Sequence, residues 1–321
     1  MTELEKFLSV KSSKKTALMS IASGNYAFCL YVSVLSLIKK SPELAGNSDI
    51  LLLIKNIPDG DKKILRTLGD NIHVIEFEIP ISIDHSHSAK WFTTATFFRY
   101  ECFNLTDKYD KVLLFDSDIM VQKELSGIFD FLNKDGIGMM PEKVNVSNFI
   151  EEVDNIKLPK PGFNAGIIAL DKRLNIGKEI TKFCYEMTEK YAENLWTADQ
   201  GIINLACGKF NLDVAKLPVI YNMPASLSGS KLKDAVIIHP TGHRKFWGYY
   251  YFNDWYKYYE QWIENGGAPC FAARKDSERY KKFIKKHGLE NKVFFQLCPD
   301  FFKNPVKALR FALKYLLKIR Y

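Results

Sequence analysis

Apolar runs typical of β-strands alternate with segments of helical periodicity over the first third of the chain. Strands are predicted at residues 16–21, 48–56 and 71–79, and helices at residues 25–40 and 59–70. Alternation of this kind is typical of a parallel sheet whose connecting helices pack on its faces. The sequence therefore predicts an α/β layer fold.

The same two patterns continue along the rest of the chain. A helix at residues 88–109 leads into a strand that ends at Asp116. Further elements are predicted as strands at 137–142, 163–171 and 234–242, and as helices at 176–194 and 197–208. From about residue 249 the chain is aromatic and basic, which predicts a helical appendage after the main fold.

Length and charge limit the classes of protein to which this chain can belong. The 321 residues are 47% hydrophobic, enough for a large core in one domain or two. The net charge of +8 suits anionic partners, but it does not choose among phosphates, nucleotides, nucleic acid and an acidic membrane surface. The six cysteines form no C-x-x-C pair, which argues against a zinc site and favours reduced thiols in the core.

The sequence carries no signal for export or membrane insertion. The first fifteen residues mix charges of both signs and lack the apolar stretch of a signal peptide. No apolar run approaches the ~18 residues of a spanning helix. We therefore expect a cytoplasmic protein.

Two acids, Asp116 and Asp118, follow directly after the buried strand "VLLF". Aspartate is a poor strand former and is costly to bury unpaired. Acids at this spacing in a tight turn can converge on one hard cation, such as magnesium, manganese or calcium. The alternative interpretation is a pair of turn-capping acids.

Three later stretches place polar side chains at predicted strand ends or helix starts. These are "GFNAG" at residues 162–166, "ADQGIIN" with Asp199 and Gln200, and "HPTGHRKFW" with His239 and Lys245. An ordinary turn, a helix N-cap and a structural histidine are the alternative explanations. In open α/β sheets, however, ligands bind at the carboxyl ends of the strands. Imidazole is a metal ligand and lysine a phosphate partner, so these stretches favour a site for a metal and phosphates.

The ordered set "FDSD", "FNAG", "ADQGIIN" and "HPTGHRKFW" resembles glycosyltransferase family 8, which includes glycogenin and bacterial lipopolysaccharide galactosyl- and glucosyltransferases. The resemblance runs from about residue 15 to residue 247. It implies a GT-A-type nucleotide-binding fold, with a mixed, mainly parallel sheet flanked by helices. We expect this catalytic domain at residues 1–262, followed by a small basic helical region at residues 263–321.

The resemblance also implies roles for individual residues. Asp116, Asp118 and His239 would bind manganese, or magnesium as the alternative, which bridges the diphosphate of a UDP-sugar. Asp199 and Gln200 match the acid and the amide beneath the anomeric carbon. The positions that match donor contacts are Ser23, Tyr26, Arg99, Asp116, Ser117, Asn164, Ala165, Gly242 and Lys245. The family's Lys-Pro-Trp reads Lys245-Phe246-Trp247 here, so the loop is free to bend differently, because proline fixes φ and phenylalanine does not.

The function implied by the resemblance is a retaining, metal-dependent transfer of a hexose, glucose or galactose, from a UDP-sugar to a glycan or a lipid-linked glycan such as lipopolysaccharide. Double displacement and front-face attack both stay open as mechanisms. A nucleotidyl- or phosphotransferase using the same acids is an alternative, although the sequence has no P-loop motif. A basic nucleic-acid-binding module is a second alternative, but it would not need acids at strand ends.

The last nineteen residues, 303–321, have a basic face and an apolar face when wound as a helix. One interpretation is an interfacial helix on an anionic membrane, which would place the protein peripherally on the inner face of the cytoplasmic membrane. The other is a helix that docks its apolar face on the catalytic domain. The sequence does not predict the oligomeric state.

Overall fold

A computed structural model describes residues 2–10, 12–83, 93–142, 153, 155–191, 198–226, 232–242, 245–247 and 252–270. The basic C-terminal region lies outside these ranges from residue 271 onward, and with it the proposed membrane helix at residues 303–321. The helix predicted at residues 88–109 is described from residue 93.

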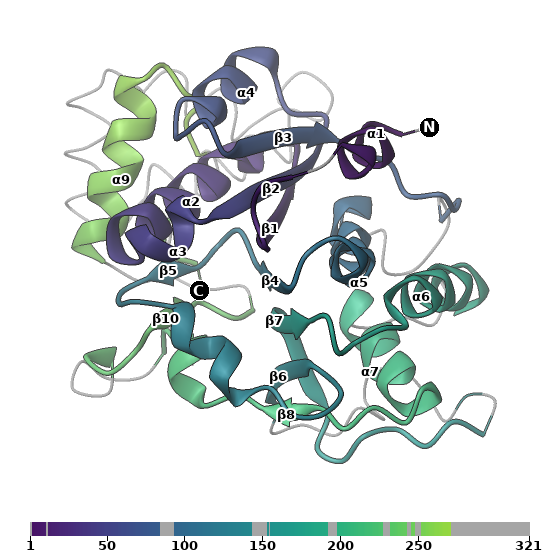
Figure 1. Ribbon diagram of the computed structural model, residues 1–321. Helices are drawn as coiled ribbons and strands as arrows, with labels where there is room; N and C mark the ends of the chain where they lie inside the picture. Colours follow the sequence, from purple (N-terminus) through teal and green to yellow (C-terminus); the bar gives the residue numbers. More distant parts are fainter. Residues whose placement is uncertain are drawn as a thin grey trace, which may run out of the picture.

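A seven-stranded sheet forms the centre of the molecule, in the order β3-β2-β1-β4-β7-β6-β8 (Figure 1). β7 runs antiparallel to both of its neighbours, and the other pairings in this sheet are parallel. The expected mixed, mainly parallel sheet is therefore confirmed. The strands are β1 (Thr16–Ser23), β2 (Ser48–Lys55), β3 (Ile72–Glu76), β4 (Lys111–Phe115), β6 (Ile137–Pro141), β7 (Phe163–Asp171) and β8 (Ala215–Lys216).

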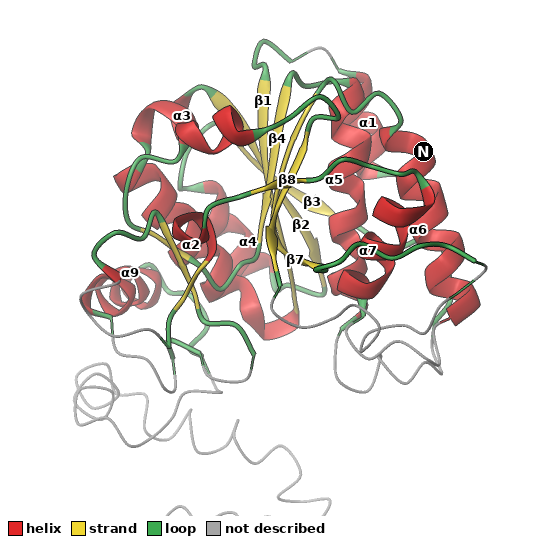
Figure 2. Cartoon of the chain, turned by 90° about the horizontal axis from the view of Figure 1, so that it is seen from below, coloured by secondary structure: helices red, strands yellow, loops and turns green. Residues whose placement is uncertain are grey.

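Helices cover both faces of this sheet, as Figure 2 shows. One face carries α2 (Ala27–Lys40), α3 (Pro42–Gly46), α4 (Asp59–Arg66) and α9 (Asn253–Glu264). The other carries α1 (Glu3–Ser9), α5 (Glu101–Asn104), α6 (Gly177–Tyr191) and α7 (Asp199–Lys209). Because successive side chains of a strand point to opposite faces, one strand serves both cores. Leu113 of β4 lies in the first core, and Leu114 lies in the second.

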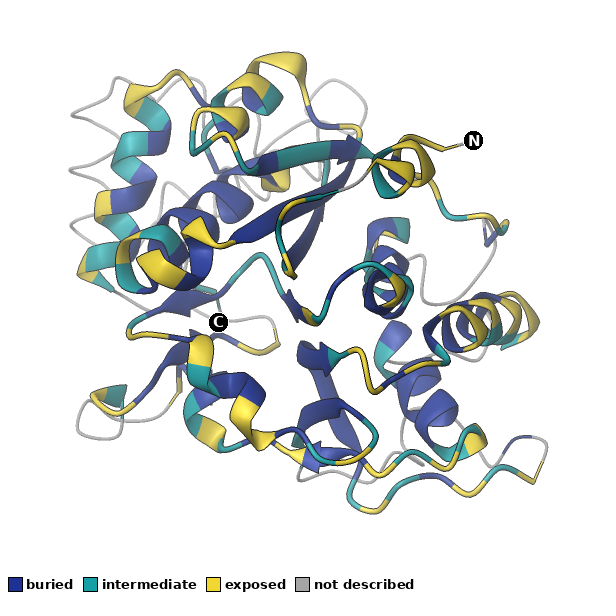
Figure 3. Cartoon of the chain, in the orientation of Figure 1, coloured by how far each residue is buried: buried dark blue, intermediate teal, exposed yellow. Residues whose placement is uncertain are grey.

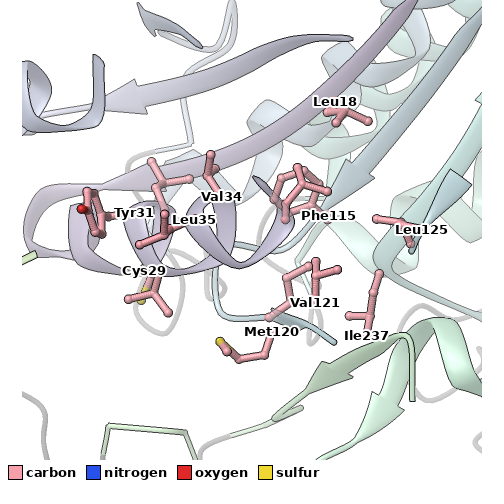
Figure 4. Packing of buried hydrophobic residues seen from close by; sticks show 14 of the residues in the cluster. Leu18, Cys29, Tyr31, Val34, Leu35, Phe115, Met120, Val121, Leu125 and Ile237 are labelled. Carbon is pink, nitrogen blue, oxygen red and sulfur yellow. The ribbon is translucent and has the colours of Figure 1, made fainter. Parts of the chain in front are cut away.

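The core around α2 holds the sheet against the aromatic part of the chain. Figure 4 shows side chains of α2, including Val34 and Leu35, near Phe115 of β4 and the short strand β5 (Met120–Val121). The rings of Trp255 and Tyr259 in α9 pack edge-on against Phe28 of α2. The boundary that we expected after residue 262 falls within the last turn of α9, so the division into two domains remains a proposal.

The segment before β4 differs from the expected continuous α-helix. Two 3₁₀ segments, η3 (Thr94–Tyr100) and η4 (Leu105–Asp107), flank the single α-helical turn of α5. The apolar residues Phe97, Phe98 and Phe103 are buried as the pattern predicted. Hydrophobic spacing alone did not distinguish the tighter winding, since both helix types bury one side.

A second, three-stranded sheet lies beside the main one, in the order β5-β10-β9. β10 (Ile237–His239) pairs with β5, which follows the Asp116–Asp118 turn, and with β9 (Met223–Pro224). This pairing brings a strand from late in the chain to the two acids.

The sequence pattern missed α1 and α3. Thr2 and Glu5 form a reciprocal capping box at the start of α1, a signal that could have predicted this helix. The five cysteines within the described ranges are buried free thiols, as expected. None of the helices described combines the length and apolar character that crossing a membrane requires. Figure 3 shows the buried strands at the centre and exposed residues on the outer sides of α4, α6 and α9.

Candidate active site

The predicted site residues gather at the carboxyl edge of the parallel strands. Asp116 follows β4, and Ser23 ends β1. Asn164 and Ala165 begin β7, and because β7 is antiparallel, its start lies at the same edge. The backbone N–H of Asp116 donates to the carbonyl of Gly166 at 2.8 Å, which joins the two segments.

Asp116, Asp118 and His239 converge on one point. Nε2 of His239 lies 3.5 Å from Oδ2 of Asp116 and 3.3 Å from Oδ1 of Asp118. One ligand atom from each of the three residues lies within 4.8 Å of the others. Gly166 leaves room for this cluster, since a Cβ there would lie 2.6 Å from Cε1 of His239 and 2.8 Å from Oδ2 of Asp116.

This donor set fits a hard divalent ion. Two carboxylates and one imidazole supply oxygen and nitrogen ligands, which suit manganese and magnesium, and no thiolate takes part. Three protein ligands also leave coordination positions for the oxygens of a bound diphosphate. The residues present therefore fit the metal that the resemblance implies.

Lys245 lies beside this cluster and adds a positive charge next to Asp118. Its Nζ donates to Oδ2 of Asp118 and, at 2.9 Å, to the carbonyl of Pro240. Burial by itself would raise the pKa of Asp118, but the His239 ring and the Lys245 ammonium beside its carboxylate outweigh it and hold that pKa well below its ordinary value. Asp118 is thus held as a carboxylate, the form that binds a cation.

The loop that carries Lys245 is fixed by two features. Gly242 has a φ of 76°, a left-handed conformation that glycine adopts without strain. Phe246 is fully buried, and its ring packs against those of Phe252 and Trp255. Burial of Phe246 therefore anchors the loop at the position where the family pattern has proline.

Arg99 links the metal-binding acids to the start of α7. Its guanidinium bonds Oδ1 of Asp116 and pairs with Oδ2 of Asp199, both at 2.9 Å, and it donates to the carbonyls of Thr96 and Ala165. The side chain is 11% exposed. A buried cation therefore lies between two acids at the edge where the donor phosphates are expected.

Asp199 begins α7 as predicted, and its carboxylate is buried. Oδ1 accepts a hydrogen bond from the Thr96 hydroxyl at 2.6 Å. Burial raises the pKa of Asp199 to about 6, against the opposing effect of Arg99. The preceding residue, Ala198, has a φ of 49°, which is strained for a residue with a side chain.

The amide of Gln200 has a defined orientation. Its Oε1 accepts from the backbone N–H of Ala165 at 3.2 Å and from Nδ2 of Asn164 at 3.3 Å. A backbone N–H can only donate, so the atom that faces Ala165 is the oxygen. Nε2 is then left without a hydrogen-bond partner in the described parts of the chain.

The remaining predicted donor contacts lie at the rim. Ser23 donates to the hydroxyl of Thr93 at 2.9 Å. Tyr26 is 44% exposed, and its ring lies against those of Phe28 and Trp247. Ser117 sits half-buried in the turn between the two acids.

Four residues at this edge were not singled out by the sequence. Glu142 follows β6 just as Asp116 follows β4, so the same signal could have found it. No sequence signal pointed to the other three. These three are Thr96, Asn204 and Asn222. The side chain of Asn204 forms hydrogen bonds with the backbone of Phe163 and with the carbonyl of Gln200. The side chain of Asn222 lies between His239 and Asn164.

The fold, with its candidate site at the carboxyl edge of the sheet, is similar to that of solved glycosyltransferases of the GT-A type. The sequence profile described as glycosyl transferase family 8 matches residues 17–250. The chain belongs to that family and is a transferase of sugars. Among proteins with curated descriptions, none matches the sequence significantly.

Solved structures with the same fold include three glycosyltransferases: WbbM, LgtC and GlyE. The bifunctional glycosyltransferase WbbM aligns with a TM-score of 0.60 and 19% identity, over 79% of this chain and 52% of that one. The galactosyltransferase LgtC, in complex with donor and acceptor sugar analogues, aligns with a TM-score of 0.55 and 20% identity, over 83% and 99%. GlyE of Streptococcus pneumoniae aligns with a TM-score of 0.52 and 21% identity, over 79% and 64%. The chain thus spans about half the length of WbbM, and these similarities establish the fold.

Proposed function

We propose that this protein transfers a hexose, glucose or galactose, from a UDP-sugar to a glycan or lipid-linked glycan, with retention of anomeric configuration and with a divalent metal ion. The observation that supports this most directly is the convergence of Asp116, Asp118 and His239 beside two partly buried cations, Lys245 and Arg99. LgtC, with its bound donor and acceptor sugar analogues, supports the same class of substrates.

The side chains around the acids suit departure of UDP. As the glycosidic bond breaks, negative charge grows on the diphosphate, and a manganese or magnesium ion at the three ligands would supply Lewis-acid stabilisation. Lys245 and Arg99 add fixed positive charge to the same region, with side chains only 26% and 11% exposed. Charges in a partly buried site, where the effective dielectric constant is lower than that of water, stabilise a developing anion more than they would in water.

The orientation of Gln200 favours front-face attack over double displacement. The Oε1 that would have to act as a nucleophile already accepts two hydrogen bonds, from Ala165 and Asn164. The Nε2 group is the one that can donate to the donor sugar. We therefore propose that Gln200 stabilises the reacting sugar as a hydrogen-bond donor, and that a phosphate oxygen of the leaving group takes the acceptor's proton.

We expect both Gln200→Ala and Gln200→Glu to slow transfer by about tenfold to a hundredfold, because each removes the Nε2 donor. Binding of UDP should stay close to wild type, since Gln200 does not contact the acids or Lys245. Steady-state transfer rates and UDP affinity check this. A Gln200→Glu variant as fast as wild type would instead favour a nucleophile at this position.

We expect Lys245→Ala to lower kcat/KM for the UDP-sugar by about tenfold to a hundredfold, through loss of a charge-assisted contact of about 1.5–3 kcal/mol. The matched control is Lys62→Ala, which removes a lysine of α4 that pairs with Asp59 of the same helix and with Glu76 at the end of β3. Kinetics of both variants beside their melting temperatures check the result. Wild-type kinetics for Lys245→Ala would remove this residue from the donor site.

A panel of UDP-sugars tested for slow hydrolysis without acceptor, with and without manganese, would identify the donor. Thermal stabilisation by UDP with manganese, compared with nucleoside triphosphates and oligonucleotides, tests the two alternative functions. Preferential stabilisation by triphosphates would favour a nucleotidyl- or phosphotransferase, and stabilisation by oligonucleotides would favour a nucleic-acid-binding module.

Attachment to an anionic membrane through residues 303–321 remains part of the proposal, and it would bring the site to a lipid-linked acceptor from the cytoplasmic side. The support is the charge pattern of the sequence alone. Vesicle sedimentation with the full chain and with a chain ending at residue 299 tests it. Equal binding of both to anionic vesicles, or binding by neither, would contradict this proposal.

A further inference from the structure

We propose that Asn222 is a positioning residue that fixes the tautomer of His239 and couples the metal site to the donor-sugar side of the active site. This inference rests on the proposed function and deepens it. Asn222 is the last residue of η8 (Val219–Asn222) and is fully buried. Its amide lies between the His239 imidazole and the Asn164 side chain.

The orientation of this network follows from one backbone group. The N–H of Gly166 lies 2.9 Å from the side-chain atom of Asn164 that it faces. Because a backbone N–H only donates, that atom of Asn164 is the acceptor, Oδ1. The Asn222 atom 2.8 Å from the same oxygen must then be the donor, Nδ2.

The orientation of Asn222 in turn determines the state of His239. With Nδ2 directed to Asn164, Oδ1 of Asn222 faces Nδ1 of His239 at 2.8 Å. An amide oxygen only accepts, so Nδ1 carries the hydrogen, and in the neutral imidazole the lone pair is on Nε2. That lone pair faces the carboxylates of Asp116 and Asp118, where a cation would bind all three.

The same network reaches the donor-sugar side. Nδ2 of Asn164 donates to Oε1 of Glu142 at 2.7 Å and to Oε1 of Gln200 at 3.3 Å. A continuous line of hydrogen bonds therefore joins His239, Asn222, Asn164 and Gln200. Rotation of the Asn222 amide would place its Oδ1 against Oδ1 of Asn164, two acceptors face to face, so a single orientation satisfies the whole line.

Because these side chains are buried, His239 and Asn164 depend strongly on their hydrogen bonds to Asn222. Asn222 is 0% exposed, and Asn164 and His239 are 8% and 4% exposed. Water has little access to replace a lost partner, so a truncated Asn222 would leave buried polar groups unsatisfied. The His239 ring would also lose the contact that holds its Nε2 toward the acids.

Two substitutions separate the two roles of Asn222. Asn222→Ala removes both hydrogen bonds, and we expect manganese affinity to fall by about tenfold to a hundredfold, as for loss of other partners of metal ligands. Asn222→Asp keeps an acceptor for Nδ1–H but sets an oxygen against Oδ1 of Asn164. It should keep most of the manganese affinity and still lose about tenfold in kcat/KM for the UDP-sugar, the effect of about one lost hydrogen bond.

The experiment is calorimetric titration of manganese into the full chain without UDP, followed by donor kinetics. Asn71→Ala is the matched control, because it also removes two side-chain hydrogen bonds, to the carbonyls of Ala45 and Ser48 at the opposite edge of the sheet. Melting temperatures report folding of each variant.

Weaker manganese binding by Asn222→Ala, with normal binding by Asn71→Ala, supports the inference. Wild-type manganese affinity in Asn222→Ala, an equal loss in Asn71→Ala, or unfolding of both Asn222 variants would overturn it. A wild-type protein that does not bind manganese would instead contradict the metal in the proposed function itself.

Discussion

The Asp118→Asn variant is expected to lose manganese-dependent binding of UDP and to remain folded. Asparagine has nearly the same shape but lacks the charge that a hard cation needs. Loss of an outer partner of a metal ligand already costs about tenfold to a hundredfold in affinity, so loss of a ligand itself should cost more than about a hundredfold. UDP titrations with and without manganese, beside melting curves, measure both parts of the expectation.

The control for this variant is Asp70→Asn, which neutralises an exposed acid at the opposite edge of the sheet. It should bind UDP and manganese as the wild type does. Manganese-dependent binding that survives in Asp118→Asn would show that the acids after β4 do not hold the metal.

Gly166→Ala is expected to disrupt the same site, because the added methyl group would clash with the prospective metal ligands. A Cβ at this position would lie 2.6 Å from Cε1 of His239, 2.8 Å from Oδ2 of Asp116 and 3.0 Å from Oδ1 of Asn164. Contacts this short force two prospective metal ligands apart, and overpacking of this kind costs about 1–3 kcal/mol. Since ligand geometry must hold within about 0.5 Å, we expect manganese affinity and transfer rate to fall by at least about tenfold.

Gly60→Ala is the matched control, since a Cβ on this residue of α4 would meet no atom within 4 Å. That variant should be as active as the wild type and slightly more stable, by up to about 1 kcal/mol. Calorimetric titration with manganese and thermal melting of both variants decide the outcome. Normal manganese affinity in Gly166→Ala would mean that the ligands do not meet above this glycine.

The strand and helix patterns of the first third were sufficient to predict β1, β2, β3, α2 and α4. Side chains that alternate or recur with helical spacing report local burial directly. The pattern before β4 predicted which phenylalanines are buried but not the 3₁₀ winding of η3. The polar residues at strand ends singled out Asp116 and His239 as candidates. Asp116 follows β4 of the main sheet, and His239 ends β10 of the second sheet, which pairs with β5 just after the two acids.

Other parts of the site depend on contacts that sequence spacing does not encode. Lys245 meets Asp118 across 127 positions, and Thr96 meets Asp199 across 103. The local sequence does not distinguish Asn222 from any other asparagine near a turn. Only the tertiary structure shows that it lies between His239 and Asn164. Its role could not have been inferred from the residues around it.

The sequence by itself determined the strands of the main sheet other than β8, and the chemistry of the side chains at its edge, because both depend on residues close together in the chain. The tertiary structure alone decided the order of the strands, the antiparallel direction of β7 and the line of hydrogen bonds from His239 to Gln200. Those features arise where distant segments pack together, and the direction of β7 is what carries Asn164 and Gly166 to the two acids. The orientation of each amide then follows from the backbone N–H groups that this packing brings within reach.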